Sequence, residues 1–183
     1  MHPSAPGGQP PRIPPVSRAV WAEVAATLPI TLPGPADEPL TVFTVLARHP
    51  ELFRQWVGFA GTLLLAGTLP ARARELAVLR TAHLRSCTYE WGHHVPVALA
   101  AGLPEGAVAA VASRLTDWDW APEDLLVLRA ADELHDRGEL TDPTWDGLRE
   151  LYDDRQLIEL VMLIGQYTML AFTLRTLRVR PEH

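Results

Sequence analysis

A thiol, two carboxylates and an imidazole lie close together in this sequence, at a spacing that favours a shared site. After a polar break at residues 85–86 we expect a helix that begins at Cys87. At about 100° per residue, one narrow face of that helix carries Cys87, Glu90, Trp91 and His94. Groups that can move a proton or act as a nucleophile therefore meet beside a tryptophan.

Glu75 lies in the preceding predicted helix, on a stripe that is otherwise apolar and includes Val78 and Leu79. A buried carboxylate is costly unless it is paired or hydrogen-bonded. Across an antiparallel helix pair, the nearest candidate partners are His94 and Glu90. Two carboxylates that flank one imidazole have their pKa values pushed apart, and an acid–base site requires that separation.

Each residue also has an ordinary structural explanation. A lone cysteine such as Cys87 is often a small core residue, and a lone histidine such as His94 is often a satisfied core residue. Glu75 could pair with Arg72, Arg80 or another exposed base in a contact on the helix surface. The functional interpretation is favoured because spacing confines three of the four residues to one face and the fourth to an apolar stripe.

A metal centre is the competing use of these side chains. Glu90 and His94 are four residues apart, which suits a divalent cation, and Cys87 or His93 could add a ligand. His93 points about 120° away from the shared face, so the number of ligands within one subunit falls short. We therefore predict no metal and no cofactor.

The elements that position these residues are predicted to be helices. Prolines stand where apolar-periodic stretches begin, glycines such as Gly67, Gly102 and Gly138 follow their ends, and no alternating strand pattern occurs. The expected helices are 17–27 with Ser17 as its cap and Val20 and Val24 on its apolar face, then 40–48, 50–66, 70–84, 87–101, 105–113, 122–137, 142–152 and 154–177. Short loops between them predict an all-α, compact, single-domain helical bundle.

Composition limits the classes of function. The formal net charge of -6 disfavours nucleic acid and anionic lipid as partners, and the single cysteine excludes an intramolecular disulfide. The N-terminus lacks the apolar segment of a signal peptide, so we expect a cytoplasmic protein. The apolar run 157–174 is interrupted by Glu159 and Gln166, which favours a buried helix over a membrane span.

Two domain segments and several minor features are also predicted. Ten of 17 prolines precede residue 40, so residues 1–35 are expected to form a partly disordered Pro-rich segment, followed by the helical domain 36–183. Trp118 and Trp120 are expected to form a packed loop, with a binding edge as the alternative. The charged residues 132–137 are expected to face solvent, and Gly165 indicates close helix approach.

The stretch RELAVLRTAHLRSCTYEWGHHVPVALAAGL, residues 74–103, resembles the core motif of carboxymuconolactone decarboxylase-like proteins, including the alkylhydroperoxidase D branch (AhpD-like proteins). The resemblance extends through HPELFRQW and DRQLIELVMLIGQYTMLAFTLRTL to roughly residues 40–180. It implies an AhpD-like all-α fold, a homo-trimer or homo-hexamer, and a site at Glu75, Cys87, Glu90 and His94. The peroxidase branch has a second cysteine where this chain has Glu90, so a two-cysteine mechanism is excluded.

The preferred function is cofactor-free acid–base chemistry on a small organic acid, lactone or specialised metabolite. Glu90 and His94 are predicted as the acid–base pair, Glu75 as the residue that orients the imidazole, and Cys87 as part of the site. The substrate-binding residues are predicted to be Tyr89, Trp91, His93 and Tyr167. Two alternatives stay open: a single-cysteine thiol peroxidase that uses Cys87, and a non-catalytic ligand-binding or assembly protein.

Overall fold

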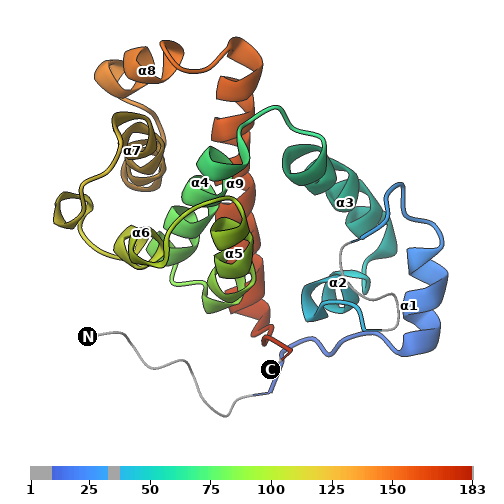
Figure 1. Ribbon diagram of the computed structural model, residues 1–183. Helices are drawn as coiled ribbons and strands as arrows, with labels where there is room; N and C mark the ends of the chain where they lie inside the picture. The colour runs from blue at the N-terminus through green and yellow to red at the C-terminus, as the bar shows by residue number, and fades with distance from the viewer. Residues whose placement is uncertain (1–9, 33–37, 183) are drawn as a thin grey trace. The chain divides into compact units, whose positions relative to one another are not determined.

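The computed structural model describes residues 10–32 and 38–182, and in these ranges it contains helices and no strand (Figure 1). The predicted all-α class is therefore confirmed. The elements are α1 Arg18–Ala25, α2 Thr41–Leu46, α3 Pro50–Leu65, α4 Ala71–Leu84, α5 Thr88–Ala100, α6 Glu105–Val111, a short 3-10 turn η1 Leu115–Asp117, α7 Pro122–Asp136, α8 Asp142–Arg149 and α9 Asp154–Leu177.

The chain divides into two units, one formed by Met1–Ala66 with Thr173–His183 and the other by Gly67–Phe172. This division differs from the expected segments 1–35 and 36–183, and the predicted domain boundary stays a prediction. The expectation of disorder before residue 15 falls partly on residues 1–9, which lie outside the described residues.

Aromatic side chains form the core of the first unit. Trp21 of α1 stacks on Phe43 of α2 at 6.5 Å, and Phe53 of α3 stacks on Trp56 at 6.0 Å. Ser17 caps α1 as predicted, because its hydroxyl accepts a hydrogen bond from the backbone N–H of residue 20. The expected apolar face of α1 is wrong in one respect. Val20 is exposed, and the larger Trp21 is buried in its place.

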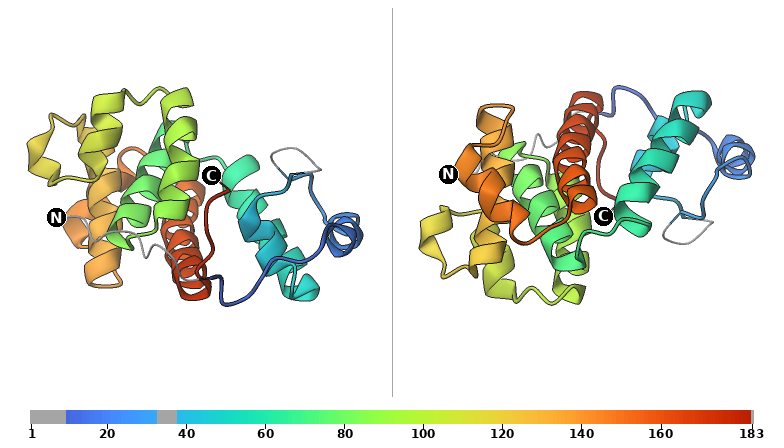
Figure 2. Two further views of the ribbon diagram at one scale, coloured as in Figure 1. Left: turned by 90° about the horizontal axis from the view of Figure 1, so that it is seen from below. Right: turned by 90° about the horizontal axis from the view of Figure 1, so that it is seen from above.

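Helix α4 is the central element of the second unit. It packs mainly against α5 and α7 and lies between them (Figures 1 and 2). The run from Leu76 to Leu79 is completely buried, so α4 contacts protein on nearly every side. A charged residue in α4 must therefore find its partner within the bundle.

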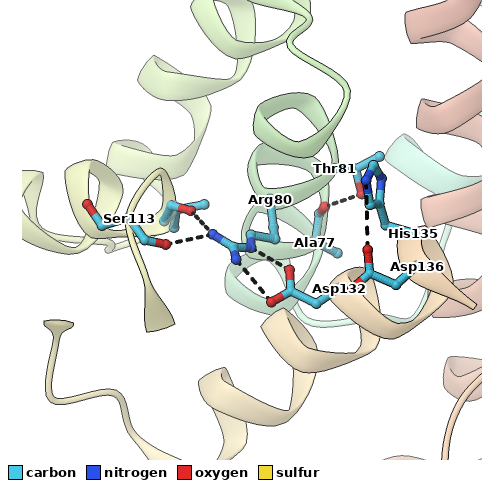
Figure 3. Close-up of polar contacts among 8 residues, drawn as sticks. Ala77, Arg80, Thr81, Ser113, Asp132, His135 and Asp136 are labelled. Atoms are coloured by element: carbon cyan, nitrogen blue, oxygen red, sulfur yellow. Dashed lines mark hydrogen bonds and ion pairs between the residues drawn. The ribbon is translucent and has the colours of Figure 1, made fainter. Parts of the chain in front are cut away.

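Two arginines of α4 bridge the helices around it. Arg80 donates to both carboxylate oxygens of Asp132 on α7 and to the backbone carbonyls of residues 111 and 113 (Figure 3). Arg72 makes a bidentate contact with Asp124 and also donates to the carbonyl of Gly102. The expectation that residues 132–137 simply face solvent is wrong for Asp132, which is 29% exposed and holds a buried guanidinium.

Helix ends follow the predicted proline and glycine pattern with one exception. Gly102 and Gly138 adopt φ values of 87° and 80°, as expected for left-handed helix stops, whereas Gly67 does not. Instead, the non-glycine Ser86 adopts a φ of 52° in the tight joint between α4 and α5. This joint turns the chain directly before Cys87, which occupies the N-cap position of α5 rather than its first turn.

Helix α9 is partly buried. Among the described residues it is the one helix long and apolar enough, by length and composition alone, to cross a membrane, and 44% of its most apolar window is buried. One side, including Leu160, Leu163 and Tyr167, is buried in the protein. The core helix of a soluble protein passes the same test of length and composition, and the burial of this side is consistent with the predicted buried helix.

Candidate active site

A chain of hydrogen bonds links three helices of the second unit. Oε2 of Glu75 on α4 lies 2.7 Å from Nδ1 of His94 on α5, and Nε2 of His94 lies 2.8 Å from the hydroxyl of Tyr167 on α9. A carboxylate only accepts, so Nδ1 carries the imidazole proton and Nε2 accepts from the tyrosine. The expected partnership of Glu75 and His94 across two helices is therefore present.

Glu75 also accepts a hydrogen bond from Arg74, whose Nε lies 3.0 Å from Oε1. This carboxylate is buried, and it is matched on one side by a guanidinium and on the other by an imidazole. Of the alternative partners, Arg72 and Arg80 are wrong, because both are bound to carboxylates of α7, and the base that pairs with Glu75 is the largely buried Arg74. Helical spacing did not single out Arg74, because adjacent residues on a helix point in different directions.

Glu90 has the opposite environment. Its side chain is 2% exposed, and neither carboxylate oxygen makes a well-formed hydrogen bond in the described structure. Burial raises the pKa of Glu90 to about 8, and the nearby Cys87 thiol offsets only part of that effect. The N-terminal turn of a helix normally favours a negative charge, yet here loss of solvation dominates. Glu90 is thus mainly a neutral carboxylic acid at pH 7.

The Cys87 thiol is buried at the start of α5, beside Glu90. Burial, followed by the negative charge of Glu90, raises the pKa of Cys87 to about 12. Because the thiolate is the reactive form, this environment disfavours nucleophilic chemistry at neutral pH.

The negative charges of both carboxylates act on the Tyr167 hydroxyl. Its pKa is raised well above the ordinary value, first by burial and then by the charges of Glu75 and Glu90. The charge of Glu90, when it is ionised, therefore acts on the same hydroxyl that contacts His94. The chain separates Tyr167 from His94 by 73 positions, and spacing alone could not predict their hydrogen bond.

The other predicted binding residues are placed around α5. Tyr89 and His93 stack on each other at 4.3 Å, and Nδ1 of His93 lies 2.8 Å from the carbonyl of Tyr89, so these two form a local pair. Trp91 meets His83 of α4 edge-on at 6.5 Å. Substrate binding by these residues and by Tyr167 stays a prediction.

In the described ranges, no three histidine, cysteine or acidic side chains converge closely enough to hold a metal ion.

A surface hollow of about 360 Å³ lies away from the acid–base residues, lined by Leu115, Thr116, Trp118, Asp119, Trp120, Leu125 and Arg129. Trp118 covers Gly106 and its ring centroid lies 6.1 Å from that of Trp120, so this segment combines a packed loop with an open edge.

Comparisons with known proteins agree with the resemblance noted in the sequence. The model of the carboxymuconolactone decarboxylase family matches residues 50–133, which contain Glu75, Cys87, Glu90 and His94. No curated protein matches the chain.

Solved structures with a similar fold include two peroxidase-related proteins and a debrominase. The alkylhydroperoxidase AhpD core of an uncharacterized peroxidase-related protein from Ralstonia eutropha JMP134 has a TM-score of 0.77 and 21% identity, with 96% of this chain and 94% of that chain covered. An uncharacterized peroxidase-related protein from Silicibacter sp. TM1040 has a TM-score of 0.75 and 12% identity over 98% and 96%. The debrominase Bmp8 C82A in complex with 2,3,4-tribromopyrrole has a TM-score of 0.70 and 15% identity over 93% and 91%. At these identities the likeness establishes the fold.

Proposed function

We propose that this chain is an enzyme that transfers protons to and from a small organic substrate without a cofactor. The match of the carboxymuconolactone decarboxylase family model to residues 50–133 and the fold shared with an AhpD core support this proposal. The observation that carries this proposal is the contrast between two buried carboxyl groups. Glu75 is bound to a guanidinium and an imidazole, whereas Glu90 has neither. One is suited to stabilise positive charge, and the other is suited to donate a proton.

The proton acceptor of this site is His94. Its Nε2 lone pair points at the Tyr167 hydroxyl, so a proton taken up by the tyrosine oxygen can be passed on as the hydroxyl proton moves to Nε2. The imidazolium that results is stabilised by Glu75 at 2.7 Å. Glu90 supplies the proton to the opposite end of the reacting group, for example to a carbonyl oxygen that becomes an enol.

The three arginines of α4 are all engaged in ion pairs, which favours a neutral substrate. Arg72 and Arg80 are bound to Asp124 and Asp132, and Arg74 is bound to Glu75. None of these three guanidiniums can bind a substrate carboxylate without breaking an ion pair. A lactone or an enolisable ketone, whose carbonyl oxygen accepts from neutral Glu90, therefore fits better than a free acid.

A thiol peroxidase is the second candidate, since Cys87 lies in the same cluster and similar structures are described as peroxidase-related. The raised pKa of the thiol argues against it. The third candidate, a non-catalytic binding or assembly protein, requires no proton transfer at all. The expected cytoplasmic location and a homo-trimer or homo-hexamer stay predictions.

The test is proton exchange at the α-carbon of candidate lactones and ketones in D2O, followed by NMR. Wild type and Cys87→Ala should both accelerate exchange, and Glu90→Gln and His94→Ala should each lose about 100-fold, the scale of general acid–base catalysis. Loss of activity in Cys87→Ala, with rapid formation of a sulfenic acid by hydroperoxide in the wild type, supports the peroxidase instead. Ligand binding without exchange in any variant supports the non-catalytic class.

A further inference from the structure

The side of α9 opposite Tyr167 carries a narrow exposed stripe that is entirely apolar. Between residues 156 and 174 every exposed side chain of this helix belongs to it. Its members are Ile158 at 64% exposure, Met162 at 46%, Met169 at 48% and Phe172 at 53%, with Gly165 between the two methionines. Contiguous exposed apolar patches on a protein surface commonly mark an interaction site.

The spacing of this α9 stripe is that of a coiled-coil seam. Successive members are separated by four, three, four and three positions, so the pattern repeats every seven residues. From residue 158 to residue 172 the stripe runs for about 21 Å along the helix. A strip this long and narrow fits the flank of one other helix.

Gly165 stands at the centre of the stripe and makes it self-complementary. Apart from its chain neighbours and the backbone of its own helix, a Cβ added at Gly165 meets no atom of the described residues within 4 Å, so no contact with another described element requires glycine there. In an antiparallel pair centred on this residue, Ile158 faces Phe172 of the other helix and Met162 faces Met169. The two glycines then meet, which allows the backbones to approach closely.

We propose that a second copy of this chain docks on the α9 stripe, antiparallel and about a two-fold axis that passes near Gly165. The four large side chains offer on the order of 400 Å² per chain, about half of the ~800 Å² per partner of a standard stable interface. The half-buried Val161 and Thr168 flank the stripe and extend the contact. This area corresponds to a dimer whose population depends on concentration.

Charge at the helix ends agrees with the antiparallel arrangement. α9 begins with Asp154 and has Arg175 in its last turn. An antiparallel partner brings the acidic start of one helix towards the basic end of the other, whereas a parallel partner brings like ends together. A two-fold contact also requires an even number of chains, so it is compatible with a dimer or a hexamer and not with an isolated trimer.

Disulfide trapping tests both the contact and its direction. In a Cys87→Ala background, Gly165→Cys should form a disulfide-linked species of twice the 20.2 kDa chain mass under mild oxidation. The control Ala109→Cys, exposed on α6, should not. When Ile158→Cys and Phe172→Cys chains are mixed, the mixed disulfide should form at least 10-fold faster than either homodisulfide. Faster homodisulfides, or no trapping at position 165, overturn the proposal.

Light scattering over a dilution series gives an independent measurement. The wild type should pass from dimer to monomer, or from a larger even assembly to half of it, as concentration falls. Gly165→Leu should keep its helical content and shift the midpoint at least 10-fold towards higher concentration, because the added side chain blocks the close approach. An unchanged midpoint contradicts the proposal, as does co-sedimentation of the wild type with phosphatidylcholine vesicles, which indicates lipid as the occupant.

Discussion

Replacing Glu90 with glutamine should change how the stability of the protein depends on pH. The folded chain holds the Glu90 proton up to a pKa of about 8, whereas an unfolded chain releases it near 4.5. Between these values the folded state binds more protons than the unfolded state, so the free energy of unfolding falls as pH rises. The stabilising contribution is complete below pH 4.5 and is lost as pH rises through 8.

The magnitude follows from the two pKa values. One pKa unit corresponds to about 1.4 kcal/mol, so titration of Glu90 should remove about 3 kcal/mol of stability between pH 5 and pH 8. Glu90→Gln has no titrating group at this position and should lack that decline. The difference between the variant and the wild type should therefore grow in favour of the variant by about 1 kcal/mol per pH unit.

Urea unfolding followed by tryptophan fluorescence, at one protein concentration and at pH 5, 6, 7 and 8, measures this difference. Glu105→Gln is the matched control, because Glu105 is exposed in the first turn of α6, and its difference from wild type should stay flat. A flat difference for Glu90→Gln as well would refute the argument that burial keeps this carboxyl neutral. The proposed role of Glu90 as a proton donor would then lose its basis.

Three further predictions follow from individual contacts. Tyr167→Phe removes the hydroxyl that contacts His94, and it should lower the α-proton exchange rate at saturating substrate about 10-fold or more with little change in KM. Cys87 should react with iodoacetamide at pH 7.5 at least 100-fold more slowly than free cysteine, measured by intact mass, because its pKa is about 12 and it is buried. Asp132→Asn should lower the free energy of unfolding by about 2 kcal/mol, since Arg80 loses its charged partner, whereas Asp136→Asn, 72% exposed, should have little effect in the same urea titration.

Most of the fold could be predicted because local signals and tertiary packing agree. Proline at the first turn and apolar periodicity predict α3 and α7 within one residue of their ends. The joint at Ser86 could not be predicted in the same way. A serine carries no signal for positive φ, and the conformation is imposed by the tight connection of two packed helices.

The candidate site was predictable where a residue conflicted with its surroundings. Glu75 lies on an apolar stripe, where a carboxylate requires a partner, and an antiparallel neighbouring helix brings His94 within hydrogen-bonding distance of it. The pairing with Arg74 was hidden because three arginines lie on the same short helix and only packing decides which carboxylate each one meets. The sequence predicts Tyr167 as a substrate-binding residue but not its hydrogen bond to His94, because the register of α9 against α5 is a tertiary property.

The state of Glu90 connects stability with function. A buried carboxyl group without a well-formed hydrogen bond costs on the order of 1–3 kcal/mol, and a residue of similar volume without that group would pack there more favourably. Glu75, buried just as deeply, avoids this cost through Arg74 and His94. Residues 74–103 thus carry one matched and one unmatched carboxyl group whose charges both act on Tyr167. Such an arrangement has little value as packing, and it supports the proposed proton transfer, in which one group stabilises charge while the other gives up a proton.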